Sequence, residues 1–221
     1  MPYYVTPRSI APTMILTRRE LTTVLNDLHQ RKNLSLSVHF LLVLFRLAAC
    51  CGLRVSEIAN LNLCDVCVDG PRPHLRIRKG AAKGGKARIV PLWWDAGTLE
   101  DLKQWKQRRL AQVAVIESPF LCSSRPGREQ KVYSRHTLRK RFKTACKVLG
   151  LARLSTLTIH HGRHTFISHA LAGGRTLAEV RDAAGHANVS ITSAYLHIAV
   201  EDESIGNLFG TPSTGTRPTN K

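Results

Sequence analysis

Hydrophobic residues recur along most of the chain at the three- and four-residue spacing of helices, and in one stretch they alternate with other residues. The helical spacing predicts helices over 18–30 and 99–112, and a nearly uninterrupted apolar run predicts a buried, central helix over 37–51. Between 65 and 92 the period falls to two, which predicts two antiparallel strands joined by a flexible Gly-rich tip. The pattern therefore predicts a mainly α fold (α+β) with a small antiparallel β-hairpin or sheet.

In the predicted strands, one set of residues alternates with a second set. The first set is Leu75, Ile77, Ala87 and Ile89, and the second is Arg76, Arg78, Arg88 and Val90. Because successive side chains of a strand point to opposite faces, each set is expected to share one face of the sheet.

Capping residues predict where several helices begin and end. Capping boxes are expected at Thr17 with Glu20 and at Thr176 with Glu179, and left-handed terminating residues at Gly52 and Gly185. Further starts are expected at Ser56 for a helix over 57–61, at Ser134, at Thr158 or His160, and at Ser190 for a last helix containing Tyr195. Two ends are expected, at Gly150 and at Gly173 with Gly174. The Pro-rich segment 1–15 predicts an extended arm, and the polar segment 211–221 predicts a disordered tail.

Charge changes this picture more than composition does. The 221 residues include 33 Lys and Arg against 15 Asp and Glu, a formal net charge of +18, while the hydrophobic share of 43% argues against wholesale disorder. A surplus of this size repels itself unless a polyanion relieves it. Nucleic acid is therefore the first partner to consider, and an anionic membrane surface the second.

The membrane alternative is weak. The longest apolar stretch, 40–51, is interrupted by Arg46 and is too short to cross a bilayer. The first residues lack the basic and apolar segments of a signal peptide, and the six cysteines lack a secreted spacing. These features predict a reduced, cytoplasmic protein, associated with the nucleoid if its partner is DNA, and no membrane partner.

The basic residues are clustered. Seven Lys and Arg and no acidic residue lie between Asp69 and Asp95, and ten lie between Glu129 and Glu179. A generally basic surface would explain the total but not this clustering, which is what a groove for a double-stranded DNA backbone requires. The expected DNA contacts are Arg76, Arg78, Lys79, Lys86, Arg88, Arg135, Arg139, Lys140 and Lys143.

Four short segments carry groups suited to phosphate chemistry. They are GLRVSE at 52–57, KGGKARIVPL at 83–92, HHGRHT at 160–165, and GH at 185–186 followed nine positions later by Tyr195. Together and in this order they resemble the motifs of the tyrosine recombinases, the phage integrase family. The resemblance covers about 16–200 and implies a helical catalytic domain there.

The resemblance implies a role for each matching residue. Tyr195 would be the nucleophile and would form a reversible 3′-phosphotyrosine. Arg54 and Arg163 would clamp the scissile phosphate, because two guanidinium forks suit the non-bridging oxygens of a phosphorane-like state. The remaining roles would fall to Lys83 as the acid for the leaving 5′ oxygen, to His160 as a phosphate ligand assisting proton transfer from Tyr195, and to His186 as a further phosphate donor.

Some features leave alternatives open. Lys79 and Lys86 lie close enough to compete for the role of Lys83. Gly162 stands where the family usually has a larger apolar residue, and the spacing from Arg54 to Lys83 is long. Only about fifteen residues precede the matching region, as in the one-domain fimbrial phase-variation recombinases or a truncated relic.

Other titratable residues are expected to be structural. His161, His164 and His169 are interpreted as packing groups on their helix, and the pair Cys64 and Cys67 lacks the second pair that a zinc finger needs. No metal and no cofactor are expected, and the sequence lacks an ATP-binding phosphate loop.

The predicted function is therefore site-specific recombination of DNA. The alternatives are a type IB topoisomerase-like enzyme and a non-catalytic DNA-binding protein derived from a recombinase. Ile205, Leu208 and Phe209 give segment 201–210 an apolar face that we expect to pack on a neighbouring protomer. We expect a tetramer on paired DNA sites and a monomer or weak oligomer without DNA.

Overall fold

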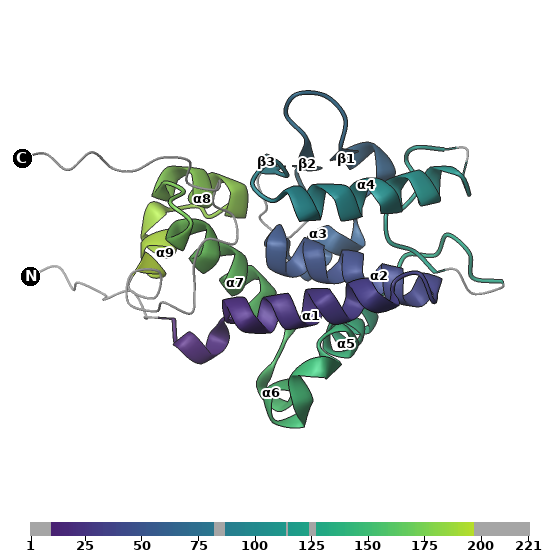
Figure 1. The fold of residues 1–221 in the computed structure, drawn as a ribbon. Helices are drawn as coiled ribbons and strands as arrows, with labels where there is room; N and C mark the ends of the chain where they lie inside the picture. The colour runs from purple at the N-terminus through teal and green to yellow at the C-terminus, as the bar shows by residue number, and fades with distance from the viewer. Residues whose placement is uncertain (1–9, 82–86, 114, 124–126, 197–221) are drawn as a thin grey trace, which may run out of the picture.

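The helices and strands follow the predicted order in a computed structural model, which describes residues 10–81, 87–113, 115–123 and 127–196 (Figure 1). The α-helices are α1 (Arg18–Arg31), α2 (Leu36–Phe45), α3 (Val55–Ala59), α4 (Ala96–Leu110), α5 (Arg135–Ala145), α6 (Gly150–Thr156), α7 (Ile159–Ala172), α8 (Leu177–Ala184) and α9 (Val189–Ser193). The strands are β1 (Val66–Cys67), β2 (His74–Ile77) and β3 (Arg88–Pro91). Short 3-10 turns are η1 (Pro12–Met14), η3 (Leu63–Asp65) and η4 (Lys147–Leu149), and η2 (Arg46–Cys50) is a π-helix. The predicted mainly helical fold with a small antiparallel sheet is confirmed.

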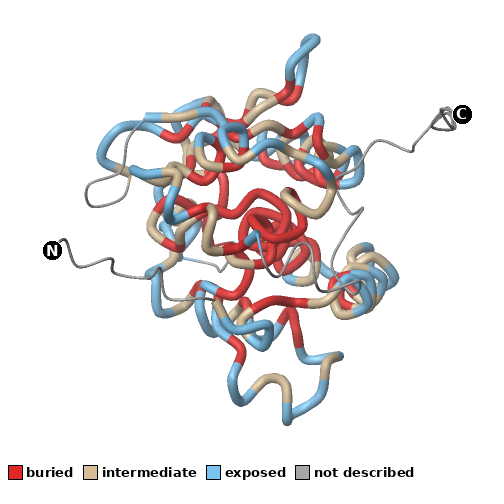
Figure 2. Tube along the Cα trace, turned by 90° about the vertical axis from the view of Figure 1, so that its left-hand side faces the viewer, coloured by how far each residue is buried: buried red, intermediate tan, exposed pale blue. Residues whose placement is uncertain are grey.

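The predicted central helix lies at the middle of the molecule. Residues 39–45 of α2 are all buried, and α1, α4 and α5 pack around it. Figure 2 shows the buried segments gathered in the interior and the exposed ones around them. No helix in the described ranges is both long and apolar enough to cross a membrane.

The helix does not remain an α-helix to its expected end. Over η2 it widens to a π-helix, closed by a bond from the backbone N of Cys51 to the carbonyl of Arg46, five residues earlier. Gly52 follows with φ +63°, the left-handed conformation that was predicted for it. The turn that carries Arg54 therefore leaves directly from the buried core.

The sheet differs from the prediction in two ways. A third strand, β1, pairs antiparallel with β2, so the order is β1-β2-β3. In β3 the predicted faces are exchanged: Val90 lies opposite Leu75 and is buried, whereas Ile89 is 52% exposed. Arg88, opposite Ile77, consequently shares the inner face, because directly paired residues of an antiparallel ladder lie on the same side.

Several helix boundaries also differ. The helix expected after Ser56 begins at Val55 with Arg54 as its N-cap. Gly150 begins the short helix α6 rather than ending the preceding segment. Asn188, not Ser190, caps α9, and Tyr195 lies in the turn beyond it. In contrast, both predicted capping boxes are present, at the starts of α1 and α8, and Gly185 ends α8 with φ +69°.

Part of the expected N-terminal arm is packed against the core. The backbone N of Leu16 donates to Thr165 Oγ1 at 2.9 Å, and the carbonyl of Leu16 bonds His169 Nε2 at 2.9 Å. Arg153 donates to the carbonyls of Thr13 and Ile15. Residues 10–16 are thereby fixed to α6 and α7. Residues 1–9, the segment 201–210 and the tail 211–221 lie outside the described residues.

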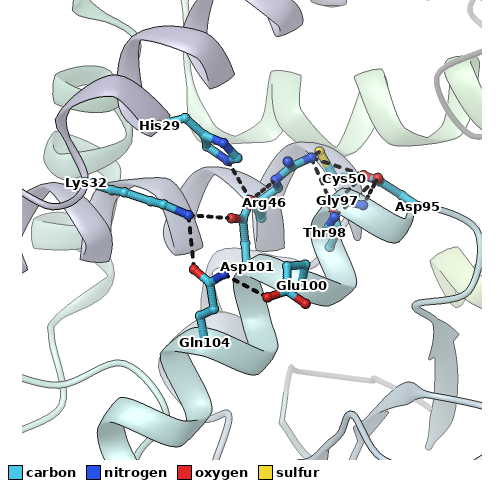
Figure 3. Close-up of polar contacts among 10 residues, drawn as sticks. All are labelled: His29, Lys32, Arg46, Cys50, Asp95, Gly97, Thr98, Glu100, Asp101 and Gln104. Atoms are coloured by element: carbon cyan, nitrogen blue, oxygen red, sulfur yellow. Dashed lines mark hydrogen bonds and ion pairs between the residues drawn. The ribbon is translucent and has the colours of Figure 1, made fainter.

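The one basic residue of the apolar run is held in a buried polar network (Figure 3). Arg46, with a side chain 6% exposed, donates from Nε to Asp101 at 2.8 Å and from Nη1 to Asp95 at 3.2 Å. His29 bonds the same Asp101 oxygen at 2.9 Å, and Lys32 lies 3.6 Å from the other oxygen. Burial opposes the charge of Arg46, yet its surroundings raise its pKa above the ordinary value. This network joins α1, η2 and α4.

Gly162 marks the closest approach between α7 and η2. A Cβ added there would lie 2.9 Å from the backbone carbonyl carbon of Ala48 and 3.0 Å from its oxygen. The glycine is thus required by helix packing, which the expectation of a loosened helical turn did not include. Close helix–helix contact at this position sets the depth at which Arg163, the next residue, enters the core.

Gly162→Ala is therefore expected to lower the free energy of unfolding by about 1–3 kcal/mol, the usual cost of overpacking. Helix propensity alone gives the opposite expectation, since Ala is favoured over Gly by about 1 kcal/mol in a helix. Urea unfolding followed by circular dichroism measures the difference, with the exposed Ala152→Leu on α6 as control. A Gly162→Ala protein more stable than wild type would contradict this account of the contact.

Candidate active site

Three arginines from three elements meet at the C-terminal end of α8. The bonds run from Arg88 Nε to Ala183 O (2.8 Å), from Arg163 Nη2 to Ala184 O (2.5 Å) and from Arg54 Nη2 to Gly185 O (3.4 Å). The last carbonyls of a helix lack intrahelical partners and carry the negative end of its dipole, so they suit cations. Successive carbonyls therefore hold three positive side chains side by side.

Glu57 supplies the negative charge that this cluster needs. Its buried carboxylate accepts from both terminal nitrogens of Arg88 at 2.8 Å, and from the side chain and backbone N of Arg54 at 3.0 and 2.8 Å. Burial would raise the pKa of Glu57, but its bonds to Arg88 and Arg54 hold it below the ordinary value. Three guanidinium groups against one carboxylate leave an excess of positive charge, which suits a phosphate anion.

Arg163 is the most enclosed of the two predicted clamp residues. It is 8% exposed and also donates from Nη1 to the carbonyl of Gly52 at 2.8 Å. Burial and the neighbouring Arg54 and Arg88 lower its pKa to about 9, so the guanidinium stays charged at neutral pH. Arg54 is more open, with a side chain 34% exposed. The pair presents one fixed and one accessible guanidinium.

Tyr195 lies beside this cluster, in the turn after α9. It is 4% exposed, and its Oη is 2.6 Å from Nδ1 of His164. Burial raises the pKa of Tyr195, while the charge of Arg163 opposes that shift. His186 stacks at 6.4 Å between ring centroids and bonds Thr192 Oγ1 through Nδ1 at 3.0 Å. Burial and the arginines lower the pKa of His186 to about 4.

The structure thus brings Arg54, Arg163, His186 and Tyr195 together at one end of α8. His160 lies at the start of α7 as an exposed residue, and burial, Arg139, Arg163 and Arg54 lower its pKa. Lys83 and Lys86 lie outside the described residues.

The residues expected to contact DNA fall into two groups. Exposed ones are Arg76, Arg78, Lys79, Arg135, Arg139, Lys140 and Lys143. Arg76 and Arg78 also lie 3.6 and 3.1 Å from the carboxylate of Asp65. Arg88 differs, because its side chain is 6% exposed and is bound to Glu57. That position does not fit contact with a DNA backbone.

Two functional positions were missed at the sequence level. Glu57 is part of the GLRVSE segment and follows Arg54 by three residues, so its capping-box position was a usable signal. His164 was interpreted as structural, but it bonds Tyr195; only its place directly after Arg163 pointed to the site. Among the residues that the structure describes, no group of three or more Cys, His, Asp or Glu is placed to hold a metal ion.

Comparison with known proteins places this geometry in a family. Residues 15–202 match the model of the phage integrase family. The chain is 30% identical over 148 residues to the tyrosine recombinase XerC of Corynebacterium efficiens, covering 67% of this chain and 43% of that protein. It is 35% identical over 152 residues to XerC of Chromobacterium violaceum, covering 69% and 46%. The chain therefore spans less than half the length of these relatives.

Solved structures show the same fold. The XerA recombinase superposes with a TM-score of 0.69 at 22% identity, covering 90% of this chain and 63% of that one. XerH, described as a site-specific recombinase bound to a palindromic difH substrate in a post-cleavage complex, superposes with a TM-score of 0.66 at 24% identity, covering 85% and 50%.

Proposed function

The chain belongs to the phage integrase family of tyrosine recombinases, and on that premise we propose that it cuts and rejoins DNA at specific sites through a 3′-phosphotyrosine intermediate. The observation that carries the proposal is the meeting of Arg54, Arg163 and Tyr195 at the end of α8, with an excess of positive charge. The DNA substrate in the description of the XerH structure supports DNA as the partner.

In the proposed reaction, Oη of Tyr195 attacks the scissile phosphorus while Arg54 and Arg163 hold the non-bridging oxygens. The bond from phosphorus to the 5′ oxygen breaks, and that oxygen takes a proton from a general acid. His160 and His186 donate hydrogen bonds to the phosphate. Rejoining is the reverse: a 5′-hydroxyl attacks the phosphotyrosine and the phenolate leaves, so the bond energy is retained and no ATP is required.

Capture of covalent adducts tests this proposal without knowledge of the target sequence. The probe is a pool of nicked duplexes with randomised sequence around the nick, so that the cut strand loses its short 5′-hydroxyl end and rejoining fails. SDS-resistant adducts formed in EDTA are isolated, and their enriched duplex becomes the substrate for all variants. No adduct above the level of a heat-denatured control would contradict the proposal.

Arg139 and Arg88 are expected to separate DNA binding from catalysis. Arg139→Gln, at an exposed position on α5, should weaken binding and reduce the log–log salt slope by about one. Arg88→Gln should leave affinity within a few-fold and slow cleavage at saturating DNA, because it removes the bidentate partner of Glu57. Fluorescence anisotropy over a KCl series and single-turnover cleavage measure the two. Equal effects on the salt slope would show that Arg88 contacts DNA.

The acid for the leaving oxygen is proposed to be Lys83. Replacing the bridging 5′ oxygen by sulfur gives a leaving group that needs no proton, so Lys83→Ala should recover most of its lost cleavage rate on that substrate. Arg54→Ala and Arg163→Ala should not recover, because they stabilise the non-bridging oxygens. Lys79→Ala and Lys86→Ala are the matched controls. Rescue of either of these and not of Lys83→Ala would move the acid to that lysine.

Recombination also requires protomers to meet on paired sites. We propose that a tetramer forms in synapsis and that segment 201–210 packs on a neighbouring protomer, since its apolar residues suit such a contact.

A further inference from the structure

One hydrogen bond of the site has no place in the roles assigned so far. It joins Oη of Tyr195 to Nδ1 of His164 at 2.6 Å, with 5.7 Å between the ring centroids. It is the contact that the structure gives to the proposed attacking oxygen. From it, and resting on the proposed function, we propose that His164 is the general base that takes the phenolic proton of Tyr195 during DNA cleavage.

Both partners are held by independent contacts. His164 lies on α7 directly after Arg163, whose guanidinium is fixed to Gly52 and Ala184. Tyr195 is held by a bond from its backbone N to the carbonyl of Thr192 at 3.1 Å, and Thr192 in turn is bonded to His186. The base and the nucleophile therefore come from separate elements, and each is positioned beside a proposed phosphate ligand. That arrangement is the geometry a proton-transfer pair needs.

The charge state of His164 suits a proton acceptor. Burial and the neighbouring His161, His160 and Arg163 lower its pKa to about 4, and His186 and Tyr195 also face it. The imidazole is consequently neutral at pH 6–8, so Nδ1 can accept the O–H of Tyr195. The same Arg163 favours the phenolate, which reduces the cost of the transfer.

His160 is less well placed for this step. It precedes His164 by one helical turn, is exposed, and is influenced by Arg139 and Arg54 on the side where DNA is proposed to bind. A position on that side suits a phosphate ligand. The division leaves His160 to the phosphate and His164 to the tyrosine.

The proposed step balances as follows. The proton of Tyr195 moves to Nδ1 of His164, the phenolate oxygen forms its bond to phosphorus, and the bond to the 5′ oxygen breaks. The leaving oxygen takes a separate proton from the general acid. In the return step the 5′-hydroxyl attacks, the phenolate leaves, and His164 gives its proton back to Tyr195.

The test combines variants at 164 with a tyrosine that ionises more readily. On the duplex enriched by adduct capture, His164→Ala and His164→Asn should cleave about 100-fold or more slowly at saturating DNA, the usual contribution of a general base. Asn offers an acceptor oxygen near the Nδ1 position but cannot take the proton. Installing 3,5-difluorotyrosine at position 195, whose phenol ionises near neutral pH, should restore most of the rate to both variants.

Matched controls separate a proton-transfer role from a structural one. Difluorotyrosine should not rescue Arg163→Lys or His160→Asn, and the 5′-sulfur substrate should not rescue His164→Ala, because the defect lies at the nucleophile. Thermal unfolding checks that the variants are folded. In DNA-free protein, the ¹⁹F resonance of 3-fluorotyrosine at 195 should shift in His164→Asn and stay in place in His160→Asn.

The outcomes distinguish this assignment from the proposed function. Adducts with wild type and an undiminished rate for His164→Ala would overturn the base and leave the recombinase mechanism standing. A faster rate would overturn it too and identify the bond as a restraint on Tyr195. Rescue of His160→Asn alone would move the base to His160. Absence of adducts with wild type would overturn the proposed function and this assignment together.

Discussion

Tyr195→Phe is expected to abolish the covalent adduct completely while leaving DNA affinity within a few-fold of wild type. The substitution removes one oxygen, which is the proposed nucleophile, and no other group of the described site can replace it in that position. The lost hydrogen bond to His164 should cost about 1 kcal/mol of stability, so the protein stays folded. Adduct capture on the enriched duplex and anisotropy titration provide the two measurements.

Tyr133→Phe is the matched control. Tyr133 lies at an edge of the core, with its ring 5.0 Å from that of Phe40 and beneath the guanidinium of Arg141. Removing its oxygen should leave both cleavage and binding unchanged. An adduct that survives in the Tyr195→Phe protein would place the nucleophile elsewhere.

Asp101→Ala is expected to cause the largest loss of stability, about 3–5 kcal/mol. The side chain is 2% exposed and accepts from both Arg46 and His29, so its removal leaves a buried guanidinium without its Nε partner. Guanidinium chloride unfolding followed by tryptophan fluorescence measures the change. Cleavage should fall in proportion to the unfolded fraction rather than at saturating folded protein.

Two comparisons test the cause of that loss. The exposed pair Arg181 and Asp182 on α8 provides a surface control, and Asp182→Ala should cost less than about 1 kcal/mol. The double variant Arg46→Met with Asp101→Leu should recover much of the stability, because neither charge then remains buried. A double variant no more stable than Asp101→Ala would mean that the ion pair is not the source of the effect.

The parts of the fold that the sequence predicted best are set by neighbouring residues. A capping box needs only a Thr and a Glu three positions apart, and both predicted boxes form. A left-handed glycine needs only the end of a helix, and Gly52 and Gly185 meet that condition. The resemblance likewise rested on short segments, and the family that it named is confirmed.

The parts that the sequence did not predict depend on distant partners. Arg88 turns inward because Glu57, 31 positions away, offers a buried carboxylate, and a period of two cannot register such a partner. His164 contacts Tyr195 across 31 positions, so its own helix pattern indicated packing. Gly162 was expected to loosen a turn because its contact, the backbone of Ala48, is also remote.

The π-helix at Arg46–Cys50 makes this segment sensitive to its length. A π-turn holds one residue more than an α-turn, and each residue of an α-helix advances the chain by roughly 100°. Deleting a single residue from 46–50 would allow the segment to return to α-helical winding and would rotate everything that follows by that angle. Arg54 would then point away from Arg163, although every side chain of the site would still be present in the gene. Substitutions and single-codon deletions in this stretch therefore have very different consequences, and a deletion here would inactivate the protein without touching a catalytic codon.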